Sequence, residues 1–235
     1  MNPADPNVQR VEAVAAALGD LREDLVLVGG CAVGLLIDAP TAPPARVTFD
    51  VDLIAEVAGL PGYHALERRF EKHGFRHDVS AGAPICRWRI GEIMVDLMPT
   101  VESVLGFSNR WYPQAVASSM RVTLPSGTAI NVISAAAFLA TKFEAFRTRG
   151  GSDISMSHDL EDIINVIEGR LSIVDDVGAA APDLRRYVAI EVAALQATPD
   201  FANLLPGLVT NDSLHGERLT LVRRRILAIA EKAVK

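Results

Sequence analysis

The spacing of hydrophobic and polar positions changes along the chain. Val11, Val14 and Leu18 repeat at helical spacing, whereas residues 25–28 form a short, fully apolar run of the kind that a buried strand shows. Gly91-Glu92 separates two apolar runs by two residues, which is typical of a β-hairpin. The first half is therefore predicted to alternate between helices and strands. The predicted helices span residues 7–20, 31–37 and 62–74, and the predicted strands span residues 24–28, 46–54, 85–90 and 93–98, with a further hairpin over 120–131 that turns at 125–127.

From Ser134 onward the apolar positions keep helical spacing only. Phe138 and Phe143 belong to one apolar stripe, and Ser134 suits the capping position before it. Ser157 is a second predicted cap, and residues 172–235 are predicted to be mostly helical.

This change of pattern predicts two domains. Residues 1–132 form a predicted α/β core, and residues 133–235 form a predicted helical domain, so the fold class is α+β. The chain has 235 residues, of which 49% are hydrophobic, and this is enough for a sizeable core. The formal net charge of −6 argues against a protein that binds polyanions without specificity.

The cysteines and the N-terminus bear on the compartment. Cys31 and Cys86 form no CxxC unit and no zinc-binding cluster, which favours a reducing environment. Residues 1–20 show helical spacing instead of the basic start and apolar core of a secretion signal. No stretch approaches the roughly 20 apolar residues of a membrane span. We therefore expect a cytoplasmic protein with no membrane partner.

An acidic pair on the second predicted strand carries the candidate chemistry. Side chains two residues apart on a strand point to the same face, so Asp50 and Asp52 project together while Phe49, Val51 and Leu53 face the core. Adjacent carboxylates repel each other, and a divalent cation is the usual reason to tolerate them. The alternative is that both point to solvent from an edge strand.

A glycine pair precedes the acidic pair by about twenty residues. Gly29-Gly30 joins the apolar strand to a predicted helix, an arrangement that lines up backbone N–H groups at the positive end of the helix dipole. Without Cβ atoms the turn lets a polyphosphate approach closely. The alternative is a turn that merely needs a positive φ. Cys31 follows, and we interpret it as a small residue at the start of the helix, because the sequence supplies no histidine partner for a nucleophile.

Three more residues are candidates around this acidic pair. Asp96 is a lone carboxylate in an apolar strand and needs a partner, and with Asp50 and Asp52 it could hold two Mg²⁺ ions. Arg46 and Thr48 share the parity of the acidic pair. Arg46 is predicted to bind a phosphate, to form a salt bridge that holds the acidic pair, or both.

The helical half contributes a lysine and an acid. Lys142 shares a helix face with apolar residues, so it either snorkels to the surface or points into a cleft, where it would supply a positive charge. Asp159 either complements a helix dipole or works with Lys142 as a base or orienting group. We interpret His158 as a surface residue and Trp88 and Trp111 as core or interface aromatics.

Taken together, these residues resemble the nucleotidyltransferase superfamily related to DNA polymerase β, and more narrowly its AbiEii-like branch, which includes toxins of toxin–antitoxin and abortive-infection systems. The resemblance spans roughly residues 20–170. It rests on Val28-Gly29-Gly30-Cys31-Ala32, Arg46-x-Thr48-x-Asp50-Val51-Asp52-Leu53, Asp96, Lys142 and His158-Asp159-x-x-Asp162-Ile163.

The resemblance implies an αβα core with a mixed sheet, followed by helices that complete the active-site cleft. It also implies an NTP substrate, Mg²⁺ on Asp50 and Asp52 with Asp96 as a third acid, and Lys142 with Asp159 as a catalytic pair. The remaining residues of its motifs are assigned to nucleotide binding: Gly29, Gly30, Cys31, Arg46 and Thr48. In some relatives a serine stands at the position of Cys31 and contacts phosphate.

The function expected from this resemblance is Mg²⁺-dependent transfer of a nucleoside monophosphate to an acceptor hydroxyl. Asp96 or Asp159 would orient or deprotonate this hydroxyl. The expected acceptor is RNA, including the tRNA 3′ end, and the protein would act as a toxin with a cognate antitoxin. Competing readings are transfer to a protein or to an aminoglycoside-like small molecule, and a catalytically inactive nucleotide-binding module. A metal-dependent phosphohydrolase is weaker, because the five histidines are scattered. The arginines available for RNA are Arg147, Arg149, Arg185, Arg186, Arg223, Arg224 and Arg225.

Overall fold

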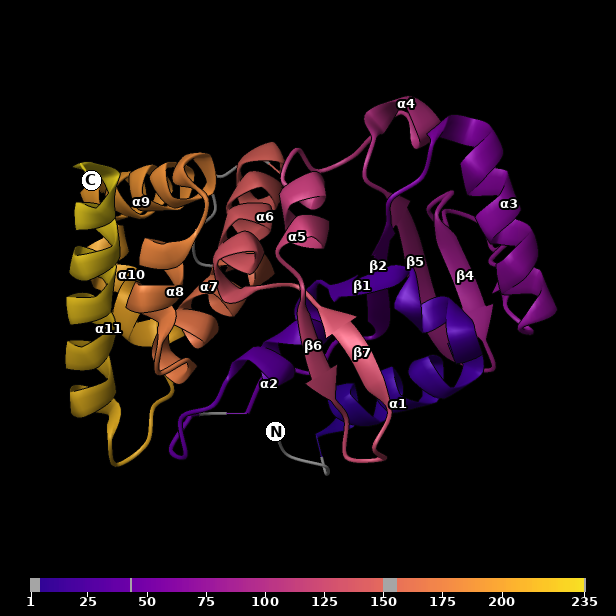
Figure 1. Ribbon diagram of the computed structural model, residues 1–235. Coiled ribbons are helices and arrows are strands. Elements are labelled where there is room, and N and C mark those ends of the chain that lie inside the picture. The colour runs from indigo at the N-terminus through magenta and orange to yellow at the C-terminus, as the bar shows by residue number, and fades with distance from the viewer. Residues whose placement is uncertain (1–4, 43, 150–155, 235) are drawn as a thin grey trace. The chain divides into compact units, whose positions relative to one another are not determined.

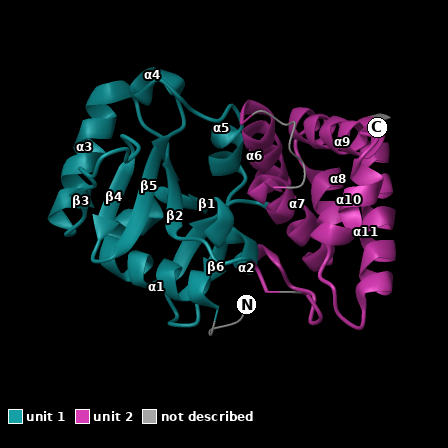
Figure 2. Ribbon diagram, turned by 180° about the vertical axis from the view of Figure 1, so that it is seen from behind, with its two compact units in different colours: residues 1–35, 46–134 teal, residues 36–45, 135–235 magenta. Residues whose placement is uncertain are grey.

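The computed structural model describes residues 5–42, 44–149 and 156–234. The chain divides into two compact units, which Figure 2 colours separately. The first unit consists of residues 1–35 and 46–134, and the second of residues 36–45 and 135–235. Residues 36–45 thus group with the helical unit, although they precede the second strand in the sequence. The domain boundary between residues 132 and 133 stays a prediction.

A mixed seven-stranded sheet forms the centre of the first unit, as predicted (Figure 1). The strand order is β3-β4-β5-β2-β1-β7-β6. Strand β1 pairs antiparallel with β2 and parallel with β7, while β2 pairs parallel with β5. The strands are β1 Leu25–Val28, β2 Asp50–Ala55, β3 Arg76–His77, β4 Arg87–Ile90, β5 Ile93–Pro99, β6 Met120–Thr123 and β7 Ala129–Val132.

Helix α1 covers one face of this sheet. Asp5 caps it by accepting a hydrogen bond from the backbone N–H of Asn7, and its apolar stripe, which includes Val11 and Val14, lines the same small cavity as Val51 and Leu53 of β2. The odd-numbered residues of β2 therefore face α1. The helices that begin in this unit are α1 Pro6–Leu18, η1 Gly19–Glu23, η2 Gly30–Ala32, α2 Val33–Leu36, α3 Gly59–Lys72, α4 Glu102–Leu105 and α5 Tyr112–Ala117.

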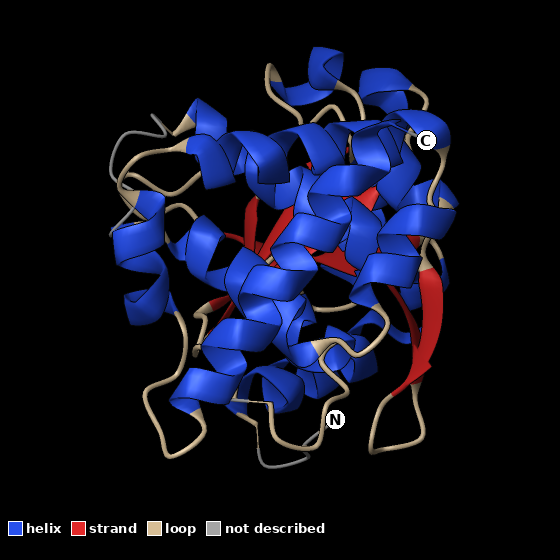
Figure 3. Cartoon of the chain, turned by 90° about the vertical axis from the view of Figure 1, so that its left-hand side faces the viewer, coloured by secondary structure: helices blue, strands red, loops and turns tan. Residues whose placement is uncertain are grey.

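The second unit is helical in the part that the structure describes (Figure 3). The oxygen Oγ of Ser157 accepts a hydrogen bond of 3.2 Å from the backbone N–H of Leu160, so the predicted cap is confirmed. Asp38 and Ala39 attach the 36–45 segment, because their backbone N–H groups both donate to the carbonyl of Gly169. The helices are α6 Ala135–Thr148, α7 His158–Gly169, α8 Ile173–Ala179, α9 Pro182–Ala197, α10 Phe201–Leu208, α11 His215–Ala230 and η4 Glu231–Val234. Within the described segments, none of the helices combines the length and the apolar character that crossing a membrane requires.

The second predicted strand is shorter than expected. It was predicted over residues 46–54, but β2 begins at Asp50. Asn7 of α1 binds the preceding segment: its Nδ2 donates to the carbonyl of Arg46, and its Oδ1 accepts from the backbone N–H of Thr48. These backbone groups are then not available to a neighbouring strand. Phe49 is accordingly 70% exposed, and its predicted place in the core is wrong.

Candidate active site

The carboxylates of Asp50 and Asp52 lie on an interior strand of the sheet. Val51 and Leu53 are buried against α1, so the two aspartates point to the opposite face, as predicted. Strand β2 lies between β1 and β5, which excludes the alternative of an edge strand. Both acids remain partly accessible, and the side chain of Asp50 is 35% exposed.

Gly29 brings the turn after β1 against the acidic pair. Its φ is 65°, a conformation that favours glycine, and a Cβ at this position would lie 1.8 Å from Oδ2 of Asp52. Val28 and Asp52 are register partners across β1 and β2, so the strand pairing itself brings the turn to the carboxylate. The positive φ is therefore one reason why a glycine stands at position 29, and the close carboxylate is another. The turn also leaves room for a carboxylate.

Gly30 also lacks a Cβ where other side chains, those of Thr48 and Arg46, come close to the turn. A Cβ there would lie 2.4 Å from Cγ2 of Thr48 and 3.3 Å from Nη2 of Arg46. The guanidinium of Arg46 thus lies beside the glycine turn, as a phosphate-binding role requires, and this role stays a prediction. The turn and the acidic pair, about twenty residues apart in sequence, are brought together.

Cys31 and Thr48 lie beneath the turn and are buried. The sulfur of Cys31 is 2.9 Å from the hydroxyl of Thr48, and both side chains are almost fully excluded from solvent. Burial raises the pKa of the Cys31 thiol to about 12, so it is not a nucleophile at neutral pH. The predicted part of Cys31 and Thr48 in nucleotide binding stays a prediction, and their side chains contact each other instead of solvent. The parity argument does not extend to Thr48, because this residue precedes the strand.

Arg87 is the partner that Asp96 requires, and the sequence analysis missed it. Its Nε donates to Oδ1 of Asp96 at 2.8 Å and its Nη2 to Oδ2 at 2.7 Å, while the same Nη2 also donates to Oδ2 of Asp50 at 2.9 Å. The hydrogen bonds to Asp96 raise the pKa of Arg87 further, so its charge is permanent. A signal was present: counting back from the turn at Gly91-Glu92 pairs Ile90 with Ile93, and hence Arg87 with Asp96.

The donor set around β2 fits Mg²⁺ through two carboxylates. Mg²⁺ is usually held by one or two carboxylates together with substrate phosphates. Asp50 and Asp52 satisfy this, since both point to one face beside the glycine turn. Arg87 binds both oxygens of Asp96. Among the described residues no group of three histidine, cysteine, aspartate or glutamate side chains is arranged to hold a metal. The use of Asp96 as a third ligand stays a prediction.

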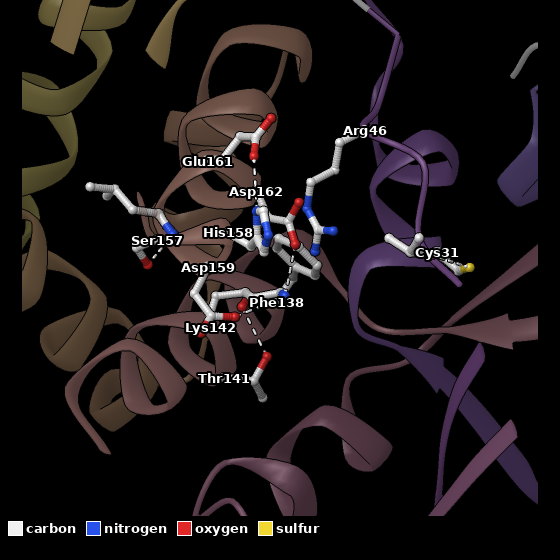
Figure 4. Close-up of polar contacts among 12 residues, drawn as sticks. Cys31, Arg46, Phe138, Thr141, Lys142, Ser157, His158, Asp159, Glu161 and Asp162 are labelled. Carbon is white, nitrogen blue, oxygen red and sulfur yellow. Dashed lines mark hydrogen bonds and ion pairs between the residues drawn. The ribbon is translucent and has the colours of Figure 1, made fainter. Parts of the chain in front are cut away.

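Lys142 and the first turns of α7 form a buried ion-pair cluster in the helical unit (Figure 4). The Nζ of Lys142 lies 3.1 Å from Oδ1 of Asp159 and 2.8 Å from Oδ2 of Asp162. Arg149 contacts the other oxygen of Asp159 at 2.9 Å. Lys142 therefore does not snorkel to the surface, and it contacts Asp159, while the catalytic partnership of the two residues stays a prediction. Asp162 is the closer partner, which the sequence analysis did not select as a site residue.

His158, Trp88 and Trp111 lie where the sequence predicted them, on the surface and in the core. The side chain of His158 is 73% exposed and pairs only loosely with Glu161, at 3.4 Å. Trp88 and Trp111 are buried. All three predictions are confirmed.

Comparisons with known proteins give distant structural likeness only. No protein-family model matches the sequence, and no curated protein matches it. The solution structure of the antibiotic-resistance factor ANT(2'')-Ia is similar with a TM-score of 0.48 and 19% identity, covering 84% of this chain and 94% of that one. The crystal structure of ANT(2'')-Ia with adenylyl-2''-tobramycin gives 0.46 and 18%, covering 80% and 97%. JHP933 from Helicobacter pylori gives 0.48 and 11%, covering 98% and 94%. These values are too low to carry an argument about substrate or reaction.

Proposed function

We propose that the chain is a nucleotidyltransferase that moves a nucleoside monophosphate from an NTP to an acceptor hydroxyl. The observation that carries this proposal is the contact between Gly29 and Asp52. It joins a glycine turn, whose backbone suits a phosphate, to a pair of carboxylates that suits Mg²⁺. Neither feature alone would support a phosphoryl-transfer site.

The candidate site residues of the first unit each have a role in this proposal. Asp50 and Asp52 would hold Mg²⁺, which when bound neutralises phosphate charge and stabilises the leaving pyrophosphate. The backbone of Gly29-Gly30 would cradle the phosphates, and Arg46 would add a positive charge beside them. The acceptor oxygen forms a bond to the α-phosphorus while the bond to pyrophosphate breaks. The proton of the acceptor hydroxyl would go to Asp96 or Asp159, the two acids proposed for this role.

The catalytic role of Lys142 and Asp159 stays a prediction. Their ion pair is sufficient to fix α7 against α6, since Asp162 and Arg149 belong to the same cluster. We propose that Lys142 also provides the positive charge that the resemblance assigns to it. A substitution that keeps the charge and changes its position, Lys142→Arg, tests this role against the structural one.

The first candidate for the acceptor is RNA, including the tRNA 3′ end, with the protein acting as a toxin that a cognate antitoxin restrains. Support comes from the resemblance of the motifs to the AbiEii-like branch.

A compact hydroxyl, on a small molecule or a protein, is the second candidate, and the use of the arginines favours it. Arg225 is buried and donates to the carbonyls of Ile167 and Glu168. Arg147 pairs with Glu191 at 2.6 Å, and Arg149 pairs with Asp159. Arg225 is therefore not available to an RNA backbone in this acidic chain, whereas the side chains of Arg147 and Arg149 stay 61% and 73% exposed beside their partners.

The test is incubation with each α-labelled NTP, Mg²⁺ and either total RNA or a panel of small polyhydroxyl compounds, including aminoglycosides. We expect label to move to one class of acceptor. Asp52→Asn should abolish the transfer, and Asp78→Asn, which removes an acid that pairs with Arg89, should not. Equal transfer by the parent and Asp52→Asn would overturn the proposal.

A further inference from the structure

We propose that Arg87 is a built-in cation that takes the place of a second metal ion, so that the site binds one divalent ion on Asp50 and Asp52. This inference rests on the proposed function and deepens it. It concerns the number of ions and the work of Arg87 and Asp96, neither of which follows from the acidic pair alone.

The position of Arg87 carries the first step. Asp52 and Asp96 are register partners on the parallel strands β2 and β5, and Asp96 is the register partner of Arg87 on β4. Three charged side chains therefore form one row across the sheet. Arg87 reaches from the end of this row to Asp50, with its Nη2 between Oδ2 of Asp96 and Oδ2 of Asp50. A cation that bridges two carboxylates is the arrangement that a second ion would otherwise supply.

The geometry at Asp96 carries the second step. Arg87 engages both oxygens of this carboxylate in a bidentate fork, the strongest form of this pair. The side chain of Asp96 is 10% exposed and that of Arg87 is 18% exposed, so solvent screens the pair weakly. A divalent ion on Asp96 would have to lie within a few ångströms of a permanently charged guanidinium.

Charge balance carries the third step. Asp50, Asp52 and Asp96 bring three negative charges, and Arg87 returns one positive charge. Among these four side chains, before a nucleotide binds, the remaining two negative charges are what one divalent cation neutralises. Arg87 is thus a positioning residue: it fixes one oxygen of Asp50 from the side and holds Asp96 away from the metal.

The test is electron paramagnetic resonance of the intact protein loaded with Mn²⁺, alone and with α,β-methylene analogues of the purine and pyrimidine triphosphates in turn. Two Mn²⁺ ions in one site, about 4 Å apart, give a spin-coupled spectrum, whereas a single ion gives isolated lines. We expect isolated lines, lost in Asp52→Asn and retained in Asp96→Asn with a Kd about tenfold weaker than that of the parent, because Asp96 contributes no ligand but its charge no longer offsets that of Arg87.

A second variant keeps the result independent of folding. Arg87→Gln combined with Asp96→Asn replaces the ion pair by two amides that can hydrogen-bond, so no buried charge is left alone. Relative to Asp96→Asn, it should tighten Mn²⁺ binding about tenfold, because it removes a positive charge next to Asp50. Arg89→Gln is the matched control, since Arg89 lies two residues along β4 and pairs with Asp78 instead. It should leave Mn²⁺ binding unchanged.

The outcomes separate the two proposals. A spin-coupled spectrum in the parent that becomes a single-ion spectrum in Asp96→Asn overturns the role of Arg87 and leaves the proposed function standing. Unchanged Mn²⁺ affinity in the double variant also overturns that role. Equal Mn²⁺ binding by the parent and Asp52→Asn removes the metal site, and the proposed function with it.

Discussion

The carboxylate of Asp52 lies so close to the α-carbon of Gly29 that a single added methyl group would meet its Oδ2 at 1.8 Å. This contact joins two parts of the sequence, the turn after β1 and the acidic strand β2, that carry little weight when considered separately. It also makes a direct prediction about the glycine.

Gly29→Ala should disturb the site as well as the backbone. An alanine at a φ of 65° costs about 1–3 kcal/mol of backbone strain, and its methyl group must also displace Asp52. Gly127→Ala is the matched control, because Gly127 has a φ of 85° and nothing within 4 Å of an added Cβ. Urea unfolding should show the backbone strain in both variants and a larger loss of stability in Gly29→Ala, and only Gly29→Ala should also lose Mg²⁺ binding. Retention of normal Mg²⁺ affinity in Gly29→Ala would contradict the role assigned to the contact.

Removing Arg87 alone should destabilise the protein strongly. Arg87→Gln leaves Asp96 as a buried charge without its partner, and breaking such a pair costs about 3–5 kcal/mol. The double variant with Asp96→Asn should recover most of this loss. Arg89→Gln, at a pair in which the arginine is more exposed, should cost about 1 kcal/mol or less. These values come from chemical unfolding at pH 7. A double variant no more stable than Arg87→Gln would show that the buried charge is not the source of the loss.

Burial of Cys31 should make stability fall in alkaline solution. The thiol has its pKa raised to about 12 in the folded protein, from 9.0, because burial disfavours the thiolate. The unfolded thiol therefore loses its proton at a lower pH, and its contribution to stability is present below pH 9 and lost as pH rises through 12. Between these pH values the free energy of unfolding should fall less steeply with pH in Cys31→Ala than in the parent, by about 1.4 kcal/mol per pH unit. An identical pH dependence of the free energy of unfolding in the two proteins would refute the burial effect.

Lys142 should matter for stability whether or not it is catalytic. Lys142→Met leaves Asp159 and Asp162 without their shared lysine in a buried environment, and a loss of about 3 kcal/mol is expected. Lys142→Arg keeps a positive charge near both acids and should retain most of the stability. If Lys142 also binds phosphate, Lys142→Arg will show normal thermal unfolding together with at least about a tenfold loss of kcat/KM. Full activity in Lys142→Arg would leave the lysine a structural role only.

The sequence was informative wherever local periodicity decides the structure. The apolar run at 25–28, the alternation of Asp50 and Asp52 with Val51 and Leu53, and the hairpin at Gly91-Glu92 each fix strands from neighbouring residues alone. The cap at Ser157 is equally local. These features were enough to predict the individual strands, whereas the mixed sheet was expected from the family resemblance.

The errors arose where a distant residue decides the conformation. Asn7 lies about forty residues from Arg46 and Thr48, yet its side chain binds the backbone of both and ends the predicted strand early. Phe49 is exposed and Thr48 is buried for this reason. Strand parity, which served well for Asp50, has no meaning in a segment that is not a strand.

Asp96 shows how a partner on another strand escapes a local analysis. The need for a partner was predicted correctly from the cost of burying a charge. The sequence analysis named a metal shared with Asp50 and Asp52 as that partner and did not consider an arginine. Arg87 is the register partner across the β4–β5 hairpin, and its identity follows from the turn length once that turn is trusted. The chemistry of a motif therefore needs the register of its strands before its ligands can be assigned.

The central claim is that Asp50 and Asp52 bind Mg²⁺ together with a nucleotide at the Gly29 turn. Isothermal titration of the parent protein with Mg²⁺ and α,β-methylene triphosphates tests it most directly, with Asp52→Asn and the control Asp78→Asn alongside. The account predicts Mg²⁺-dependent nucleotide binding in the parent and in Asp78→Asn, and at least about a hundredfold weaker binding in Asp52→Asn, because the nucleotide would lose the ion that bridges it to the protein. Nucleotide binding that is equally tight in Asp52→Asn, or that does not depend on Mg²⁺, would contradict it.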